Sequence, residues 1–262
     1  MRVFFFFFIL FFNFKTFSNE LLNIGVASNF YEPIQKIKQK FEKKNNVKLK
    51  IISGSSSQLY AQIVNGAPLD IFLSADQKTP QKLDSKLVVS NSQFTYAIGN
   101  LTFWTSLKDV EEKNAAIFLK KNKINIMAIA NPRFSPYGQA SKEFLVNIGV
   151  WSLYKDKLIL ANNVKQVVSF LYSGNAKYGF MSSSDKLKFR KINMGKFLNV
   201  SQKMYKNINQ DVILLSRGKN SNYSERFLRF LKSEEIKKTI KSFGYKIKNK
   251  FNNLVIFLVL IL

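Results

Sequence analysis

Short apolar runs alternate with amphipathic segments along most of this chain, and this alternation restricts the fold more than any other feature. Apolar runs bounded by polar turns predict strands, and apolar residues spaced three and four apart predict helices. We predict strands over 21–27, 47–52, 70–75, 124–130, 158–161, 178–181 and 211–215. We predict helices over 33–44, 57–65, 77–86, 139–148, 164–172, 224–231 and 234–243, with Asp76 as the N-cap of the third.

Strands that alternate with helices are typical of an α/β fold, in which mostly parallel sheets are covered by helices on both faces. The alternation restarts after a break near residues 95–105. The sequence therefore predicts two lobes of similar build.

The two ends of the chain differ from the rest. Residues 1–18 combine Arg2, an unbroken apolar run from Val3 to Phe12 and small residues near Ser18, which is the pattern of a secretory signal peptide. Because the chain has no cysteine for lipid attachment, we expect a free protein in the periplasm. The apolar stretch Leu254–Leu262 is shorter than a membrane span, and we interpret 249–262 as an extension outside the fold.

The chain contains neither cysteine nor histidine, and this excludes several kinds of chemistry. Disulfides, thiolate nucleophiles, imidazole bases and zinc sites with nitrogen or sulfur ligands are all impossible. A serine enzyme is a competing interpretation, but no Gly-x-Ser-x-Gly or Ser-x-x-Lys motif opens a predicted helix. We therefore expect no enzymatic activity, no cofactor and no bound metal ion.

The formal net charge of +25 raises a second alternative, a nucleic-acid-binding protein. Lysine greatly outnumbers arginine, and the basic residues lie mostly on the polar sides of predicted helices, as Lys36, Lys40 and Lys43 do. The charge therefore reflects a global bias in composition, and we expect no nucleic-acid partner.

Polar loops follow the predicted strands and lead into helices. Ser28 and Asn29 follow the first strand, and the sequence SGSSS at 53–57 follows the second. In the second half of the chain, 131–138 and 161–164 likewise lead from predicted strands into predicted helices. In open α/β sheets, ligands bind beyond the carboxyl ends of strands, where helix N-termini present unpaired amides and partial positive charge. These loops predict an anion site between the two lobes.

Hydroxyl and amide groups without carboxylates suit a tetrahedral dianion that carries no proton, because such an anion only accepts hydrogen bonds. Hydrogen phosphate would need an acceptor, and these loops contain no aspartate or glutamate. Each residue also has a simpler interpretation. Ser28, Ser55 and Ser56 could be N-caps, and Gly54 and Tyr137 could be ordinary turn residues.

These segments resemble the periplasmic molybdate-binding proteins of ABC importers, a branch of the type II periplasmic solute-binding proteins. The resemblance covers about 21–245 and lies in VASNF at 26–30, SGSSSQLYAQIVNGAPLDIFLSADQKTPQKL at 53–83, FTYAIGNLTFW at 94–104, ANPRFSPYGQAS at 130–141 and FLKSEEIKKTIKSFGY at 230–245. It implies two α/β lobes joined by crossing strands, a ligand cleft between the lobes, and closure by a hinge.

The resemblance also implies a donor set for the oxyanion. We use this term below for Ser28 and Asn29, Ser56 with Ser55 as its close alternative, and the backbone N–H groups of Tyr137 and Val164. Some family members add a tyrosine hydroxyl near 182, where this chain has Ser182.

The expected ligand is molybdate, with tungstate a comparable ligand and sulfate or another tetrahedral oxyanion the alternative. The expected partner is an inner-membrane permease with its ATPase subunit, and the protein itself is expected to be a monomer. On this basis we divide the chain into a signal peptide (1–18), a first lobe (19–98 with 208–248), a second lobe (99–207) and the apolar extension (249–262).

Overall fold

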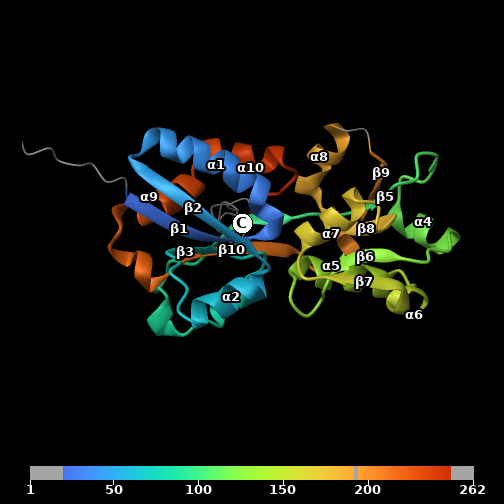
Figure 1. Cartoon of the computed structure of the whole chain (residues 1–262), viewed down its shortest axis with the longest axis horizontal. Helices are drawn as coiled ribbons and strands as arrows, with labels where there is room; N and C mark the ends of the chain where they lie inside the picture. Colours follow the sequence, from blue (N-terminus) through green and yellow to red (C-terminus); the bar gives the residue numbers. More distant parts are fainter. Residues whose placement is uncertain (1–19, 192–193, 249–262) are drawn as a thin grey trace, which may run out of the picture.

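The computed structural model describes residues 20–191 and 194–248, which fold around two separate five-stranded sheets (Figure 1). The first sheet has the order β2-β1-β3-β10-β4, and the second has the order β7-β6-β8-β5-β9. The strands of the first sheet are β1 (Glu20–Ala27), β2 (Val47–Gly54), β3 (Ile71–Leu73), β4 (Phe94–Gly99) and β10 (Ile208–Leu214). Those of the second are β5 (Leu101–Thr105), β6 (Met127–Ala130), β7 (Leu158–Ala161), β8 (Tyr178–Ser182) and β9 (Lys196–Asn199).

Each sheet is parallel except for one reversed strand. β10 pairs antiparallel with both β3 and β4, and β5 pairs antiparallel with both β8 and β9. These are the strands by which the chain enters each lobe from the other. The parallel strands of each sheet point their carboxyl ends toward the opposite lobe. A strand that enters the sheet from that lobe therefore runs antiparallel to them. The expected mostly parallel sheets with crossing strands are confirmed.

Helices cover both faces of the first sheet. They are α1 (Tyr31–Lys44), α2 (Ser56–Val64), α3 (Lys78–Gln81), α9 (Asn222–Leu231) and α10 (Glu234–Ser242), with short 3-10 turns η1 (Ser28–Phe30), η2 (Ser85–Leu87) and η6 (Ser216–Asn220). Ile24 packs in one core with α1, α9 and α10, whereas Phe72 packs in a second core with α2. Side chains of successive strand residues point to opposite faces, so one sheet supports both cores.

The second lobe is built around a larger, more aromatic core. Its helices are α4 (Ala115–Lys121), α5 (Pro136–Asn147), α6 (Trp151–Tyr154), α7 (Val164–Tyr172) and α8 (Lys186–Lys191), with 3-10 turns η3 (Lys155–Lys157), η4 (Ser183–Asp185) and η5 (Gln202–Met204). Phe103 lies at the centre, with its ring 5.0 Å from that of Phe180 and 5.9 Å from that of Phe118, measured between centroids. Contacts of this kind hold α4 and α5 against the sheet.

Several predicted elements need correction. The helix predicted over 77–86 is only α3, because Asp84 takes an extended backbone and caps a separate 3-10 turn through the Lys86 N–H. The strand predicted over 124–130 is only β6. The break predicted near 95–105 contains β4 and β5, which flank Asn100 and belong to different sheets. Helix α5 begins three residues before the predicted start, since Ser135 caps it and Pro136 occupies its first turn.

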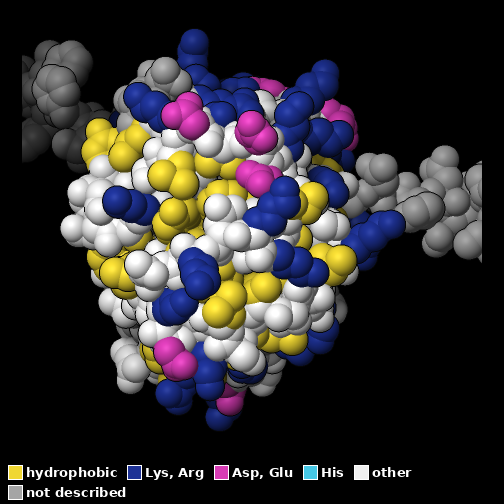
Figure 2. Space-filling model, turned by 90° about the vertical axis from the view of Figure 1, so that its right-hand side faces the viewer, with side chains coloured by type: hydrophobic (Ala, Val, Ile, Leu, Met, Phe, Trp, Pro, Cys, Tyr) yellow, Lys and Arg dark blue, Asp and Glu magenta, His cyan; other side chains and the backbone are white. Residues whose placement is uncertain are grey.

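Basic side chains are spread over the surface. Figure 2 views the end of the second lobe, and there lysine and arginine side chains are dispersed among apolar and polar ones. Within 20–191 and 194–248, no helix has the length and apolar character needed to cross a membrane. The predicted signal peptide (1–18) and apolar extension (249–262) lie outside the described residues.

Candidate functional site

The register of the first sheet brings the two polar loops of the first lobe together. Ala27 and Gly54 are directly paired at the carboxyl ends of β1 and β2, so Ser28 and Ser55 start from neighbouring positions. On the other side of β1, Val26 pairs with Leu73, so the chain leaving β3 reaches the same edge at Ala75.

The second lobe repeats this arrangement with β6 and β7. Ala130 pairs with Ala161, and the Asn131 N–H donates to the Ala161 carbonyl at 2.7 Å. The α5 N-terminus comes so close to the end of β6 that a Cβ on Gly138 would lie 2.1 Å from the Ala130 carbonyl oxygen. Glycine is therefore required at this position for α5 to start beside the strand end.

The backbone groups predicted to bind the ligand lie in the first turns of two helices. Tyr137 is the second residue of α5 and Val164 the first residue of α7. Amides in these positions have no carbonyl one turn earlier to bond to, so they are available to an acceptor outside the helix. Ser135 caps α5 by accepting from the Gly138 N–H at 3.4 Å, and Asn163 caps α7 by accepting from the Gln166 N–H at 3.1 Å.

Ser55 and Ser56 have different roles at the start of α2. Ser55 is the N-cap, and it forms a reciprocal capping box with Gln58 through hydrogen bonds of 3.2 and 2.9 Å. The Ser56 hydroxyl accepts from the Ala75 N–H at 2.9 Å, and its side chain is buried. This bond uses a lone pair, so the Ser56 hydroxyl proton is left to donate elsewhere.

Asn29 lies in η1 beside Ser28, and both are buried, but the Asn29 side chain points toward Gln210 and Tyr245. Its amide nitrogen donates to Gln210 Oε1 at 2.9 Å and to Tyr245 Oη at 3.0 Å. The backbone carbonyl of Asn29 accepts from the hydroxyls of Tyr245 and Ser184 at 2.7 and 2.8 Å. The Asn29 side chain therefore belongs to a buried hydrogen-bond network, which we call the hinge network, of Asn29, Tyr96, Tyr137, Ser182, Ser184, Gln210 and Tyr245.

The hinge network connects the lobes. Tyr137 Oη accepts from Ser182 Oγ at 3.2 Å and from Gln210 Nε2 at 3.3 Å, so a hydroxyl of the second lobe bonds to a strand of the first. Burial raises the pKa of Tyr96 and Tyr137 well above the usual value and raises that of Tyr245 to about 12. These phenols therefore stay neutral at physiological pH.

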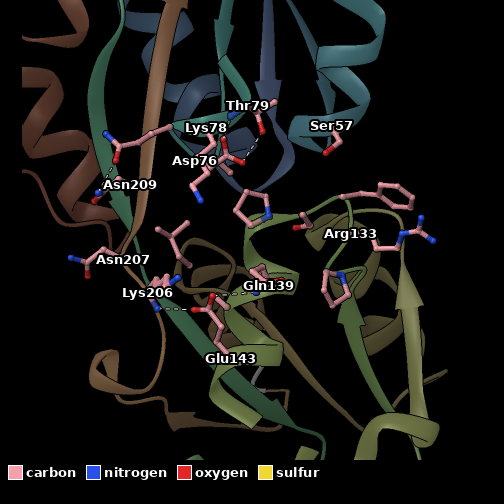
Figure 3. A pocket seen from close by; sticks show the side chains of 18 of the residues that line it. Ser57, Asp76, Lys78, Thr79, Arg133, Gln139, Glu143, Lys206, Asn207 and Asn209 are labelled. Carbon is pink, nitrogen blue, oxygen red and sulfur yellow. Dashed lines mark hydrogen bonds between the residues drawn. The ribbon is translucent and has the colours of Figure 1, made fainter. Parts of the chain in front are cut away.

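Two cavities lie between the lobes, each lined by residues of both. The larger, of about 420 Å³, is lined by Ser57 and Ala75 from the first lobe and by Ser135 and Pro136 from the second (Figure 3). The other, of about 380 Å³, is lined by Ser28 from the first lobe and by residues of α7 and its N-cap Asn163 from the second. Helix α7 also contacts η1 directly.

The structure thus places Ser28 opposite the start of α7 in one inter-lobe cavity and the start of α2, next to Ser55 and Ser56, opposite the start of α5 in the other. It directs the Asn29 side chain away into the hinge network. Sequence reasoning missed Gln210, Tyr245 and Ser184, which complete that network. Gln210 lies in the polar run Asn209–Asp211 at the start of β10, mostly before the strand predicted over 211–215, so its burial was the feature that the sequence did not reveal. Tyr245 and Ser184 gave no local signal either.

Comparison with known proteins places this arrangement in a family. The family model described as "Bacterial extracellular solute-binding protein" matches residues 22–246. The chain belongs to this family. Among other members, the molybdate-binding protein ModA of Azotobacter vinelandii is 35% identical over 225 residues, covering 86% of this chain and 89% of the relative. ModA of Rhodobacter capsulatus is 35% identical over 223 residues, covering 84% and 86%.

A solved structure shows the same solute-binding fold. The periplasmic molybdate-binding protein of Azotobacter vinelandii superimposes with a TM-score of 0.81 at 31% identity, covering 87% of this chain and all of that chain. The two lobes and the cleft between them are therefore those of a solute-binding protein.

Proposed function

We propose that this protein captures molybdate in the cleft between its lobes and delivers it to an ABC importer. The observation that carries the proposal is that both inter-lobe cavities are lined from both lobes at helix starts: Ser28 faces the start of α7 in one, and the starts of α2 and α5 face each other in the other. The identity to two proteins named molybdate-binding, over most of the chain, supports the same ligand.

The chemistry of the donor set fits a dianion. Ser28, Ser56 and helix amides donate without a fixed counter-charge, and helix N-termini favour negative charge. A protonated oxyanion would require an acceptor facing it. Among the described residues that line the cavity beside Ser28, none is a carboxylate. The two carboxylates that line the larger cavity, Asp76 and Glu143, already accept hydrogen bonds from Thr79 and Lys206. This favours molybdate, tungstate or sulfate over hydrogen phosphate.

In this proposal the protein is a non-catalytic carrier. Residues 1–18 direct it to the periplasm, molybdate or tungstate bridges the two lobes, and the closed form docks on a membrane permease driven by an ATPase subunit. Because the anion contacts both lobes only when they are closed, it shifts the population toward the closed form.

The test is a titration of the purified protein with four sodium salts: molybdate, tungstate, sulfate and phosphate. We expect molybdate and tungstate to raise the melting temperature, with a stabilisation of about 2.7 kcal/mol at a ligand concentration of 100 Kd. We expect phosphate to leave it unchanged. A response to sulfate alone would assign the protein to sulfate, and no response to any of the four would refute the proposal.

A further inference from the structure

The larger inter-lobe cavity is lined by residues next to the donor set, not by the donor set itself. Its walls come from α2 and α3 in the first lobe, from the turn before α5 in the second lobe, and from the crossing segment 206–209 (Figure 3). Ser57 and Pro136, which adjoin the donor-set residues Ser56 and Tyr137 in the chain, line it from opposite lobes. An ion in this cavity is therefore next to two donor-set segments.

The charged side chains that line this cavity have an excess of cations. Lys78, Lys82, Arg133 and Lys206 line it together with two carboxylates, Asp76 and Glu143. Both carboxylates already accept hydrogen bonds. Asp76 accepts from the N–H and hydroxyl of Thr79 at 2.6 and 2.8 Å, and Glu143 accepts from the Lys206 N–H at 2.9 Å.

Lys78 is the cation best placed to act on an incoming anion. Its side chain extends from α3 toward the space between the lobes, whereas Arg133 points outward (Figure 3). The Lys78 side chain is exposed, so its ammonium group is hydrated. Within 20–191 and 194–248, no carboxylate lies within 4.0 Å of its nitrogen.

The cavity beside Ser28 differs in charge. Among the described residues that line it, the basic one is Lys165, which donates to Glu32 across the lobes at 2.6 Å, and Asp185 lies 3.9 Å from the same nitrogen. The cavity lined by Lys78 is therefore the more favourable of the two for an approaching anion.

We propose that the Lys78 cavity is the entrance and encounter site for the oxyanion, and that Lys78 accelerates capture by long-range attraction. This inference rests on the proposed function, and it adds a residue outside the donor set. Attraction between an exposed cation and a dianion raises the association rate constant and is screened by salt. Because Lys78 does not hold the bound anion in this scheme, the dissociation rate constant is independent of it.

The experiment is stopped-flow measurement of molybdate association and dissociation, followed by intrinsic fluorescence, at about 20 mM and about 500 mM ionic strength. Lys78→Gln is compared with Lys86→Gln, which removes the same charge from an exposed position of the same lobe outside both cavities. Lys78→Glu extends the series.

We expect Lys78→Gln to lower the association rate constant about 2- to 5-fold at low ionic strength, and Lys78→Glu to lower it further. We expect Lys86→Gln to change the association rate constant by less than about 1.5-fold. At high salt, we expect the Lys78 variants and the unsubstituted protein to have the same association rate constant. Equal association rates in the two glutamine variants would overturn the inference, as would a Lys78 effect confined to dissociation. If the unsubstituted protein does not bind molybdate, both the proposed function and this inference fail.

Discussion

Gln210 donates a hydrogen bond to the Tyr137 hydroxyl at 3.3 Å and so connects strand β10 of the first lobe with helix α5 of the second. The same hydroxyl accepts from Ser182 at 3.2 Å, at the end of β8. Tyr137 therefore has two separate roles. Its backbone belongs to the predicted donor set, and its side chain stabilises the contact between the lobes.

Tyr137→Phe separates these roles. The substitution removes the acceptor for two buried donors, so the free energy of unfolding should fall by about 1–3 kcal/mol. The Tyr137 N–H remains, and the protein should still be stabilised by molybdate. Chemical denaturation with and without molybdate measures both effects. Tyr60→Phe is the control, since its exposed hydroxyl only contacts a carbonyl at 3.5 Å. Loss of the molybdate response in Tyr137→Phe alone would instead place the hydroxyl in the donor set.

The hinge network also predicts a pH dependence. Burial raises the pKa of Tyr245 to about 12, above the value of about 10 for an exposed tyrosine. Between these values the unfolded chain releases the phenol proton while the folded protein keeps it. The contribution of Tyr245 to stability is therefore complete below pH 10 and lost as the pH rises toward 12.

Denaturation of the unsubstituted protein and of Tyr245→Phe at pH 9, 10 and 11 tests this effect. Both should lose stability at alkaline pH, because Tyr96 and Tyr137 shift in the same direction. The decline should be less steep in Tyr245→Phe, by up to about 1.4 kcal/mol per pH unit. Parallel curves would show that Tyr245 does not titrate differently in the two states.

The sequence predicted most of the elements that position the site. β7 and α7 have the predicted bounds, because the apolar run ends at Ala161 before two asparagines, and Asn163 is the N-cap of α7. The errors arose where local signals compete. Short elements such as α6 and β9 lack a full period of apolar residues, and their structure depends on packing against the core of the second lobe.

In the predicted site, too, local patterns could be read from the sequence and long-range contacts could not. Ser28 and Ser56 could be placed from the sequence because each follows a strand and starts a helical turn. The orientation of the Asn29 side chain could not, since it depends on Gln210 and Tyr245, which lie about 180 and 215 residues further along the chain. Long-range partners of this kind leave no local pattern.

Ser56→Ala tests the hydroxyl donor of α2. Loss of a hydrogen bond to a charged group costs about 1.5–3 kcal/mol, so the Kd for molybdate should rise roughly 10- to 150-fold. The Ala75 N–H also loses its acceptor, and the ligand-free protein should become less stable. Isothermal titration calorimetry measures the first effect and thermal unfolding the second. Ser173→Ala, at an exposed position of the second lobe, should change neither. Unchanged affinity in Ser56→Ala would remove Ser56 from the donor set.

Gly138→Ala tests the close approach of α5 to β6. The added methyl group would meet the Ala130 carbonyl at 2.1 Å, so the helix start must move. We expect the free energy of unfolding to fall by about 1–3 kcal/mol. Molybdate binding should also weaken, because the Tyr137 amide moves with the helix. Gly54→Ala is the control, since its nearest neighbours would be 3.5 Å away. Equal stability of the two variants would contradict the packing described above.

The central claim is that hydrogen-bond donors from both lobes surround one oxyanion. A crystal structure of the protein with molybdate, in which molybdenum is located by its anomalous scattering, tests this claim most directly. We predict a single strong peak between Ser28, Ser56 and the first turns of α5 and α7, within hydrogen-bond reach of their N–H and O–H groups. A peak elsewhere on the surface, or a cleft without molybdenum at saturating ligand, would contradict it.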